Sequence, residues 1–256
     1  MTIKQLLDEK AEQYNRTQFI EPDPISIPHK FRSQCDIEIS AYLTSIISWG
    51  RRPAILKSAN RLMEIMDFEP YNFILNAGKP ELKKLEHFVY RTFNSGDCLF
   101  VVEALKQLYS NFGTMEEVAN KYYSDNLSIK DVIQGIRAEL LKTPHLERSE
   151  KHFANPANGS AAKRTNMFLR WMIRKDDKGV DFGLWKSIPA SALMMPLDVH
   201  SGNTARSLGL LERKQNDWRA VEELTNRLKK FDSDDPVKYD FALFGAGVFE
   251  GGCLLG

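Results

Sequence analysis

Two residues of this chain have side chains and surroundings that could do covalent chemistry. Lys163 follows a turn of sequence Asn-Pro-Ala-Asn-Gly-Ser, and Asp198 precedes a predicted helix in Pro196-Leu-Asp198-Val-His200. A lysine amine attacks electrophilic carbon, and a carboxylate held at a helix start supports proton transfer or a developing positive charge. A helix N-cap accounts for Asp198 equally well, and capping is compatible with catalysis.

The turn before Lys163 favours a helix start that binds an anion. Ser160 is the expected N-cap, which places Lys163 and Arg164 in the first helical turn. Cations are unfavourable at the positive end of the helix dipole, so a bound phosphate would stabilise them. The backbone amides of Gly159, Ser160 and Ala161 would hold that phosphate. An ordinary solvated basic face is the alternative. The residues expected to extend that face are Arg170, Arg174, Lys175 and Lys178.

Further candidates for contacts to nucleic acid lie in two other places. Trp49, Arg51 and Arg52 occupy a turn between two predicted helices, where the indole could stack on a base and the guanidinium groups could contact phosphate. A tryptophan that anchors a helix end and solvated arginines fit the same residues. His200 and Arg206 follow Asp198 on its helix, and a packed histidine and a solvent-facing arginine are equally consistent with them.

Composition limits the class of protein. The 256 residues contain 35 Lys and Arg and 34 Asp and Glu, so affinity for nucleic acid must come from local clustering of charge. Cys35, Cys98 and Cys253 have no paired spacing, which argues against disulfides, a metal site or an iron-sulfur cluster and favours a reducing cytoplasm. Neither a signal peptide nor a membrane span is expected.

Helical periodicity runs through almost the whole chain, and strand patterns are nearly absent, so the predicted class is all-α. Asp36 is the expected cap of a helix with apolar positions Ile39, Leu43, Ile46 and Ile47 that ends at Gly50. The glycines after Gly245 lack the spacing of a dinucleotide-binding loop. The other predicted helices cover roughly 3–15, 53–66, 80–90, 97–110, 115–123, 128–142, 160–174, 199–208, 216–230 and 236–248.

Several of these segments together resemble the helix-hairpin-helix DNA glycosylases. Gly159 stands four residues before Lys163, as in the family's hairpin, and Pro196-Leu-Asp198-Val-His200 is similar to its Val-Asp-Thr-His segment. Ile39-Ser-Ala-Tyr-Leu-Thr-Ser-Ile-Ile-Ser48 resembles an early barrel helix, and Asn166-Met-Phe-Leu-Arg-Trp-Met-Ile-Arg174 is most similar to the archaeal-type 8-oxoguanine branch. Tyr239-Asp-Phe-Ala-Leu-Phe-Gly245 resembles a closing helix of the superfamily. The resemblance spans about 37–247.

The resemblance implies a two-lobed helical fold with a DNA-binding cleft. One lobe would comprise 36–178, with a hairpin-like segment at 153–174, and the other would combine 1–35 with 190–256. Lys163 would attack C1′ of a flipped nucleotide and form a Schiff base, and Asp198 would activate it. The implied activity is base-excision repair of an oxidised purine such as 8-oxoguanine in duplex DNA, with lyase activity, as a monomer without cofactor or metal.

Two other functions are compatible with the sequence. The family's hairpin usually has Leu-Pro-Gly-Val-Gly, whereas this chain has lost the second glycine, which favours a non-catalytic DNA-binding module of the same fold. The nearly neutral net charge favours a helical protein-interaction scaffold.

Overall fold

The computed structural model describes residues 1–249, so Cys253 and the end of the predicted second lobe lie outside the described residues. The regular elements of those 249 residues are all helices, with no β-strand; isolated β-bridges join Tyr90 to Phe93 and Ser160 to Asp217. The all-α class is confirmed. No helix in this part of the chain has the length and apolar character needed to cross a membrane.

Backbone contacts divide the chain into two compact units. The first unit combines 1–20 with the segment that starts at Asn155, and the second unit comprises 21–154. The sequence predicted lobes of 36–178 and of 1–35 plus 190–256, whereas in the structure 155–178 belongs with the chain ends and 21–35 belongs with the second unit. The physical reason lies in buried ion pairs between residues far apart in the sequence, which periodicity does not reveal.

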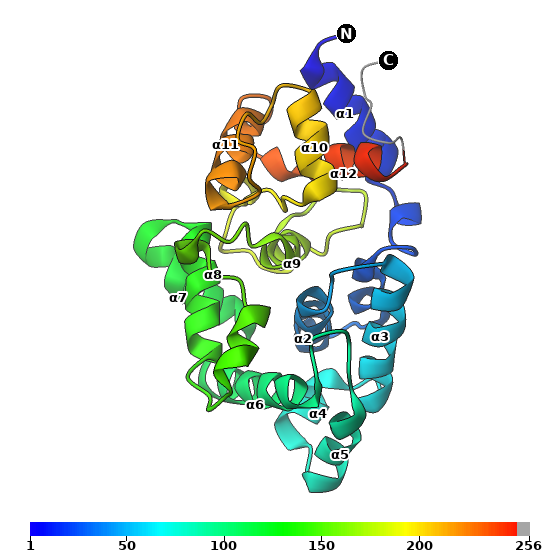
Figure 1. The fold of residues 1–256 in the computed structure, drawn as a ribbon, viewed down its shortest axis with the longest axis vertical. Coiled ribbons are helices and arrows are strands. Elements are labelled where there is room, and N and C mark those ends of the chain that lie inside the picture. Colours follow the sequence, from blue (N-terminus) through cyan, green and yellow to red (C-terminus); the bar gives the residue numbers. More distant parts are fainter. Residues whose placement is uncertain (250–256) are drawn as a thin grey trace. The chain divides into compact units, whose positions relative to one another are not determined.

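The first unit is built on the packing of helix α1 against helix α12 (Figure 1). The two helices approach so closely that a Cβ on Gly245 would lie 2.3 Å from the ring of Tyr14. Helix α10 also packs on α12. The unit contains α1 (Ile3–Tyr14), α9 (Lys163–Ile173), α10 (Val199–Ser207), α11 (Trp218–Lys229) and α12 (Tyr239–Phe249), with 3-10 turns at Thr17–Phe19, Pro156–Asn158, Ala190–Ala192 and Pro236–Lys238.

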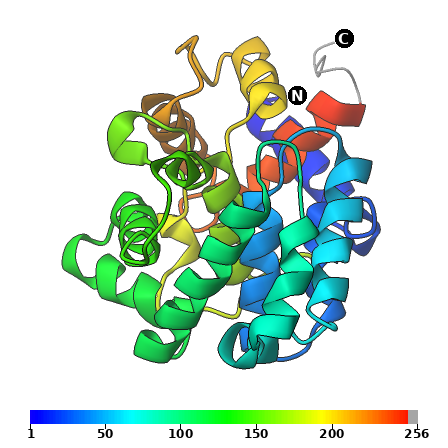
Figure 2. The same ribbon diagram turned by 60° about the horizontal axis from the view of Figure 1, so that its bottom comes forward.

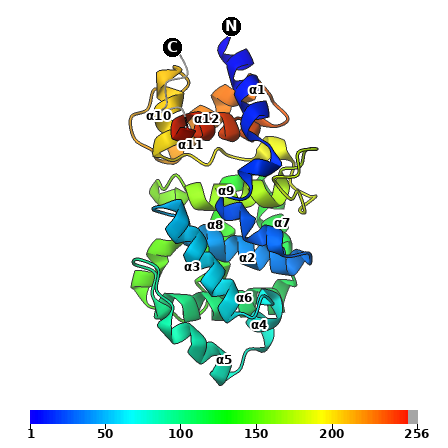
Figure 3. The ribbon, with the colours of Figure 1, turned by 90° about the vertical axis from the view of Figure 1, so that its right-hand side faces the viewer.

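The second unit is a helical bundle in which α7 and α8 pack on each other and on α6, visible as the green segments of Figure 2. Figure 3 shows α2, α3 and α4 of the same unit, where α2 contacts both α3 and α4. The helices are α2 (Gln34–Ile46), α3 (Arg52–Ile65), α4 (Pro70–Asn76), α5 (Lys79–Lys83), α6 (Ser95–Phe112), α7 (Met115–Asn126) and α8 (Ile129–Leu140). Its 3-10 turns are Pro24–Ser26, Pro28–Lys30, Lys84–His87 and Glu147–His152.

Three predicted details were wrong. The cap of α2 is Ser33, whose hydroxyl accepts from the Asp36 amide, while a carboxylate oxygen of Asp36 accepts from the amide of Tyr71. Helix α4 was missed. The segment predicted as one helix over 80–90 is a short α-helix, Lys79–Lys83, followed by the 3-10 turn Lys84–His87, and the extended backbone of Phe88 ends it.

Candidate functional site

Helix α9 presents Lys163 at its first position. The helix begins after Ala162, which adopts a left-handed conformation with φ of 49° and provides no side-chain cap. Ser160 is therefore not the N-cap that the sequence predicted; its hydroxyl accepts from the Ala162 amide at 3.2 Å. The placement of Lys163 and Arg164 in the first turn is confirmed. The helix is anchored by a fully buried stripe at Phe168, Leu169, Trp171 and Met172.

The turn before α9 uses most of its own hydrogen-bonding groups. The amides of Gly159 and Ser160 donate to Pro156 and Asn155 oxygens at 3.0 and 3.2 Å. The carbonyl of Gly159 accepts from the Trp218 amide at 3.1 Å, and the Ala161 carbonyl accepts from Asn166 at 3.1 Å. Two of the three amides expected to hold a phosphate are thus engaged within the turn. Gly159 has φ of 84°, which suits glycine.

Asp198 is the N-cap of α10, as the sequence allowed. Its Oδ1 accepts from the backbone amide of Ser201 at 3.0 Å, and the Ser201 hydroxyl accepts in return from the Asp198 amide at 3.0 Å. This capping box fixes the rotation of the carboxyl group and uses Oδ1. Oδ2 is left on the other side of the carboxyl group, where it faces another side chain.

The residue that Oδ2 faces is Lys163. The Nζ of Lys163 lies 3.8 Å from Oδ2 of Asp198, and the two side chains keep 27 % and 23 % of their surface exposed. Lys163 Nζ also lies 3.6 Å from the sulfur of Met167 and 5.9 Å from the centre of the Phe244 ring. Two residues separated by 35 positions therefore meet as a half-buried amine and carboxylate that solvent reaches.

A chain of hydrogen bonds behind Asp198 was not predicted. Asn216 donates from its amide to the Asp198 carbonyl at 2.9 Å, and Arg206 donates to Asn216 at 2.6 Å and to the Arg213 carbonyl at 2.9 Å. Gly202 makes room for this contact, since a Cβ there would lie 2.9 Å from Asn216. Arg206 thus supports the loop beside α10, although the sequence placed it at DNA.

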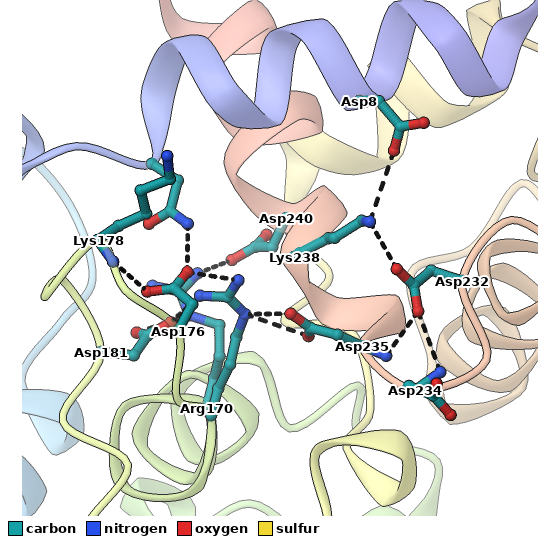
Figure 4. Close-up of polar contacts among 12 residues, drawn as sticks. Asp8, Arg170, Asp176, Lys178, Asp181, Asp232, Asp234, Asp235, Lys238 and Asp240 are labelled. Carbon is teal, nitrogen blue, oxygen red and sulfur yellow. Dashed lines mark hydrogen bonds and ion pairs between the residues drawn. The ribbon is translucent and has the colours of Figure 1, made fainter.

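Two arginines, one on α9 and one directly after it, correct the predicted basic face. Arg170 and Arg174 are only 3 % and 2 % exposed. Arg170 pairs with Asp181 and with Asp240 of α12 (Figure 4). Arg174 pairs with Asp181, with Asp176 at 2.8 Å and with Asp235 at 2.9 Å. Both guanidinium groups also lie over the ring of Phe241. Because buried charges require partners, these arginines stabilise the unit and do not face solvent.

The network contains more carboxylates than guanidinium groups, and one of these carboxyl groups, that of Asp240, has a raised pKa. Burial raises the pKa of Asp240 to about 6, opposed by Arg170 and Lys163 and reinforced by Asp198 and Asp181. Burial likewise raises the pKa of Asp235. Asp240 therefore links the buried network electrostatically to the Lys163–Asp198 pair. Sequence could have flagged it, because an acidic residue interrupts the apolar run of α12.

The remaining predicted site residues do not join this pair. His200 is exposed on the first turn of α10, and Arg164 is half-buried beside Lys163. Trp49, Arg51 and Arg52 belong to the second unit. The indole of Trp49 stacks on His152 at 5.9 Å and meets Tyr90 edge-on at 5.2 Å, so it packs at the end of α2. Arg51 is the N-cap residue of α3 and is exposed, and Arg52 is half-buried.

Among the residues that the structure describes, no cluster of three or more histidine, cysteine, aspartate or glutamate side chains could hold a metal ion. Cys35 and Cys98 are free thiols. What the first unit offers is an amine next to a carboxylate, partly open to solvent, on two helices that buried ion pairs and caps hold in place.

Comparison with known families assigns the chain to one of them. Residues 23–249 match the DUF2400 family, which is described as a protein of unknown function. The chain belongs to this family. No curated protein and no solved structure matches it.

Proposed function

We propose that this protein is a DNA repair glycosylase with Schiff-base lyase activity, acting on an oxidised purine such as 8-oxoguanine in duplex DNA. The observation that carries the proposal is the 3.8 Å approach of Lys163 Nζ to Asp198 Oδ2. The two residues that the helix-hairpin-helix glycosylases would use are the two that meet. The two-lobed fold of that superfamily is part of the same proposal.

The proposed reaction begins with the base rotated out of the duplex, since the glycosidic bond is unreachable within the stack. Lys163, as the neutral amine, attacks C1′ while the bond from C1′ to the base breaks, and the base leaves with that electron pair and takes up a proton. Asp198 accepts the proton from the amine and stabilises the positive charge on the sugar. Ring opening gives the Schiff base between Nζ and C1′.

The Schiff base then allows strand cleavage. The iminium acidifies the protons on C2′; loss of one of them expels the 3′ phosphate and breaks the C3′–O bond. Water hydrolyses the remaining imine and returns the free lysine. The fixed orientation of Asp198 by its capping box suits this role, because Oδ1 holds the backbone while Oδ2 stays directed at the amine.

The hydrogen bonds within the turn before α9 change one expectation from the resemblance, namely which groups would hold a DNA phosphate. Because the amides of Gly159 and Ser160 donate within the turn, the contacts that would hold a DNA phosphate must come from elsewhere. The N-terminus of α9, which has no side-chain cap, and the half-buried Arg164 are the neighbouring groups with the right charge.

The test is release of the modified base. Purified protein is incubated in excess with a duplex containing one 8-oxoguanine, and free base and cleaved strand are measured separately, alongside Lys163→Ala. We expect wild type to release base and cut the strand, and the variant to do neither. Duplex binding without either product would refute the enzyme and favour a non-catalytic DNA-binding module. Products that form equally with Lys163→Ala would refute the assigned nucleophile.

A further inference from the structure

The second unit contains a positively charged hollow that the Lys163 chemistry does not use. Its volume is about 490 Å³, and it is lined by Gly50, Arg51, Ala54, Tyr90 and Arg91. The volume falls in the range of roughly 300–1,000 Å³ that is usual for small-ligand sites. The lining comes from the turn before α3 and from the turn that joins Tyr90 to Phe93, two segments 40 residues apart in sequence.

The two arginines bring charge that nothing nearby offsets. Among the residues that the structure describes, neither Arg51 nor Arg91 forms an ion pair with a carboxylate, and both are exposed. This contrasts with Arg137 and Arg148 of the same unit, which pair with Glu150 and Asp97. The hollow therefore holds two guanidinium groups without a carboxylate partner among the described residues, and guanidinium donors suit an oxyanion.

Local backbone geometry places Arg91 over the hollow. Gly50 has φ of 98°, which suits glycine, and a Cβ at that position would lie 2.1 Å from Nη1 of Arg91, so a side chain there would force the guanidinium to move. Arg91 itself has φ of 54°, a left-handed conformation that is uncommon for a non-glycine residue. The position of the Arg91 guanidinium thus depends on a glycine in the opposite turn.

Tyr90 is uncharged and therefore does not reduce the positive charge of the hollow. Its side chain is buried, its hydroxyl donates to the Trp49 carbonyl, and burial raises the pKa of that hydroxyl while Arg91 opposes the shift. Tyr90 accordingly stays a neutral phenol at physiological pH and adds an aromatic wall. The ring of Tyr90 packs edge-on against Trp49, and Trp49 in turn stacks on His152.

From this arrangement we infer that the hollow between Arg51 and Arg91 binds the phosphate group of a nucleotide-sized ligand. Guanidinium groups bind phosphate through paired donors, and the hollow is larger than a phosphate alone requires, which leaves space for a sugar or base beside Tyr90. The phosphate belongs either to a free nucleotide or to a nucleic-acid strand. The inference holds whether or not Lys163 performs the proposed chemistry.

Calorimetric titration tests the site with three probes, namely inorganic phosphate, adenosine 5′-monophosphate and a short undamaged DNA duplex. The variants are Arg51→Ala and Arg91→Gly, the latter chosen because glycine accepts φ of 54°, and Gly50→Ala, which would displace Arg91. Arg32→Ala is the matched control, since Arg32 is an exposed arginine of the same unit outside the hollow. Circular dichroism establishes that each variant is folded.

We expect at least one probe to bind wild type, with binding about tenfold weaker in Arg51→Ala and Arg91→Gly and unchanged in Arg32→Ala. Binding of the nucleotide assigns a free ligand. Binding of the duplex alone assigns a strand phosphate. In that case the negative slope of log affinity against log salt concentration should become shallower by about 0.9 in each hollow variant. The inference is overturned if no probe binds, or if the hollow variants bind as tightly as Arg32→Ala. Base release and strand cleavage are measured separately from probe binding, so a wild-type protein that binds a probe but forms no product refutes the proposed enzyme and leaves this result in place.

Discussion

Helix α9 presents two kinds of cation within three turns, and their surroundings differ in every respect. Arg170 and Arg174 are buried and neutralised by four aspartates, with donors in direct contact with carboxylate oxygens. Lys163 is partly exposed and has Asp198 at 3.8 Å, beyond direct hydrogen-bonding distance. The comparison separates charge that holds the fold together from charge available for a reaction.

The difference follows from the position of each cation along the helix. Arg170 and Arg174 lie on the face that packs against Asp240 and Phe241 of α12, where a charge without a partner would cost several kcal/mol. Lys163 lies at the first position of the helix, where its side chain reaches the N-cap of α10. The charge of Lys163 is accommodated there, because solvent reaches the amine and Asp198 lies beside it.

The largest effect is expected from replacing the amine with a cation that cannot lose its proton. Lys163→Arg preserves the ion pair with Asp198 but provides no nucleophilic amine, so strand incision at an abasic site should fall at least about 10⁴-fold. Single-turnover incision of an abasic duplex measures it. If the pair were purely structural, Lys163→Arg would behave like wild type, and a residual activity within tenfold of wild type would reverse the comparison.

For the buried arginine Arg170, the expected effect is a loss of stability. Arg170→Ala removes the ion-pair partner of Asp240 and one of the two partners of Asp181, which keeps Arg174, and should lower the free energy of unfolding by about 3–5 kcal/mol. Urea denaturation measures the loss. Lys175→Ala, at an exposed position just beyond α9, is the control and should stay within about 0.5 kcal/mol. A loss below about 1 kcal/mol for Arg170→Ala would mean that the network adds little to the fold.

Asp198 combines both roles, and two variants separate them. Asp198→Asn keeps an N-cap of similar quality, so stability should change by less than about 1 kcal/mol while the incision rate falls about 10²-fold. Ser201→Ala removes the reciprocal cap but keeps the carboxylate, and should reduce stability more than the chemical step. Equal loss of stability and rate in both variants would indicate that Asp198 acts only as a cap.

The smallest expected effect is a pH dependence of stability from Asp240. Its pKa is about 6 in the folded protein against 3.8 in an unperturbed chain, so the folded state retains a proton that the unfolded state has released. Ionised Asp240 therefore costs stability, increasingly as pH rises from about 4 to about 6. Relative to wild type, Asp240→Asn should gain about 2 kcal/mol between pH 4 and pH 7. Urea denaturation across that range gives the difference, and a constant difference would contradict the raised pKa.

Much of the local structure could be predicted from sequence, because it depends on neighbouring residues. The helices α1, α3, α10 and α11 begin and end close to the predicted positions, and Asp198 as N-cap followed from its place before an apolar helix. The juxtaposition of Lys163 with Asp198 was expected only through the family resemblance. Spacing alone gives no distance between residues 35 positions apart.

The rest depends on contacts that sequence does not contain. Arg170 and Arg174 have the spacing of a solvent-facing stripe. In the structure they are buried, because aspartates on α12 and in the loops around Asp181 and Asp235 pair with them. The left-handed Ala162 displaced the helix start past Ser160. The hollow beside Arg91 was missed because it joins two turns, and Arg91 has no sequence pattern of its own.

The most direct test of the central claim is to trap and locate the covalent intermediate. Wild type is incubated with an abasic duplex in the presence of borohydride, which reduces a Schiff base to a stable amine, and the crosslinked peptide is identified by mass spectrometry. The account predicts one adduct on Lys163, absent from Lys163→Arg and reduced in Asp198→Asn. An adduct on another amine, or strand cleavage without any adduct, would contradict the assignment of Lys163 as the nucleophile.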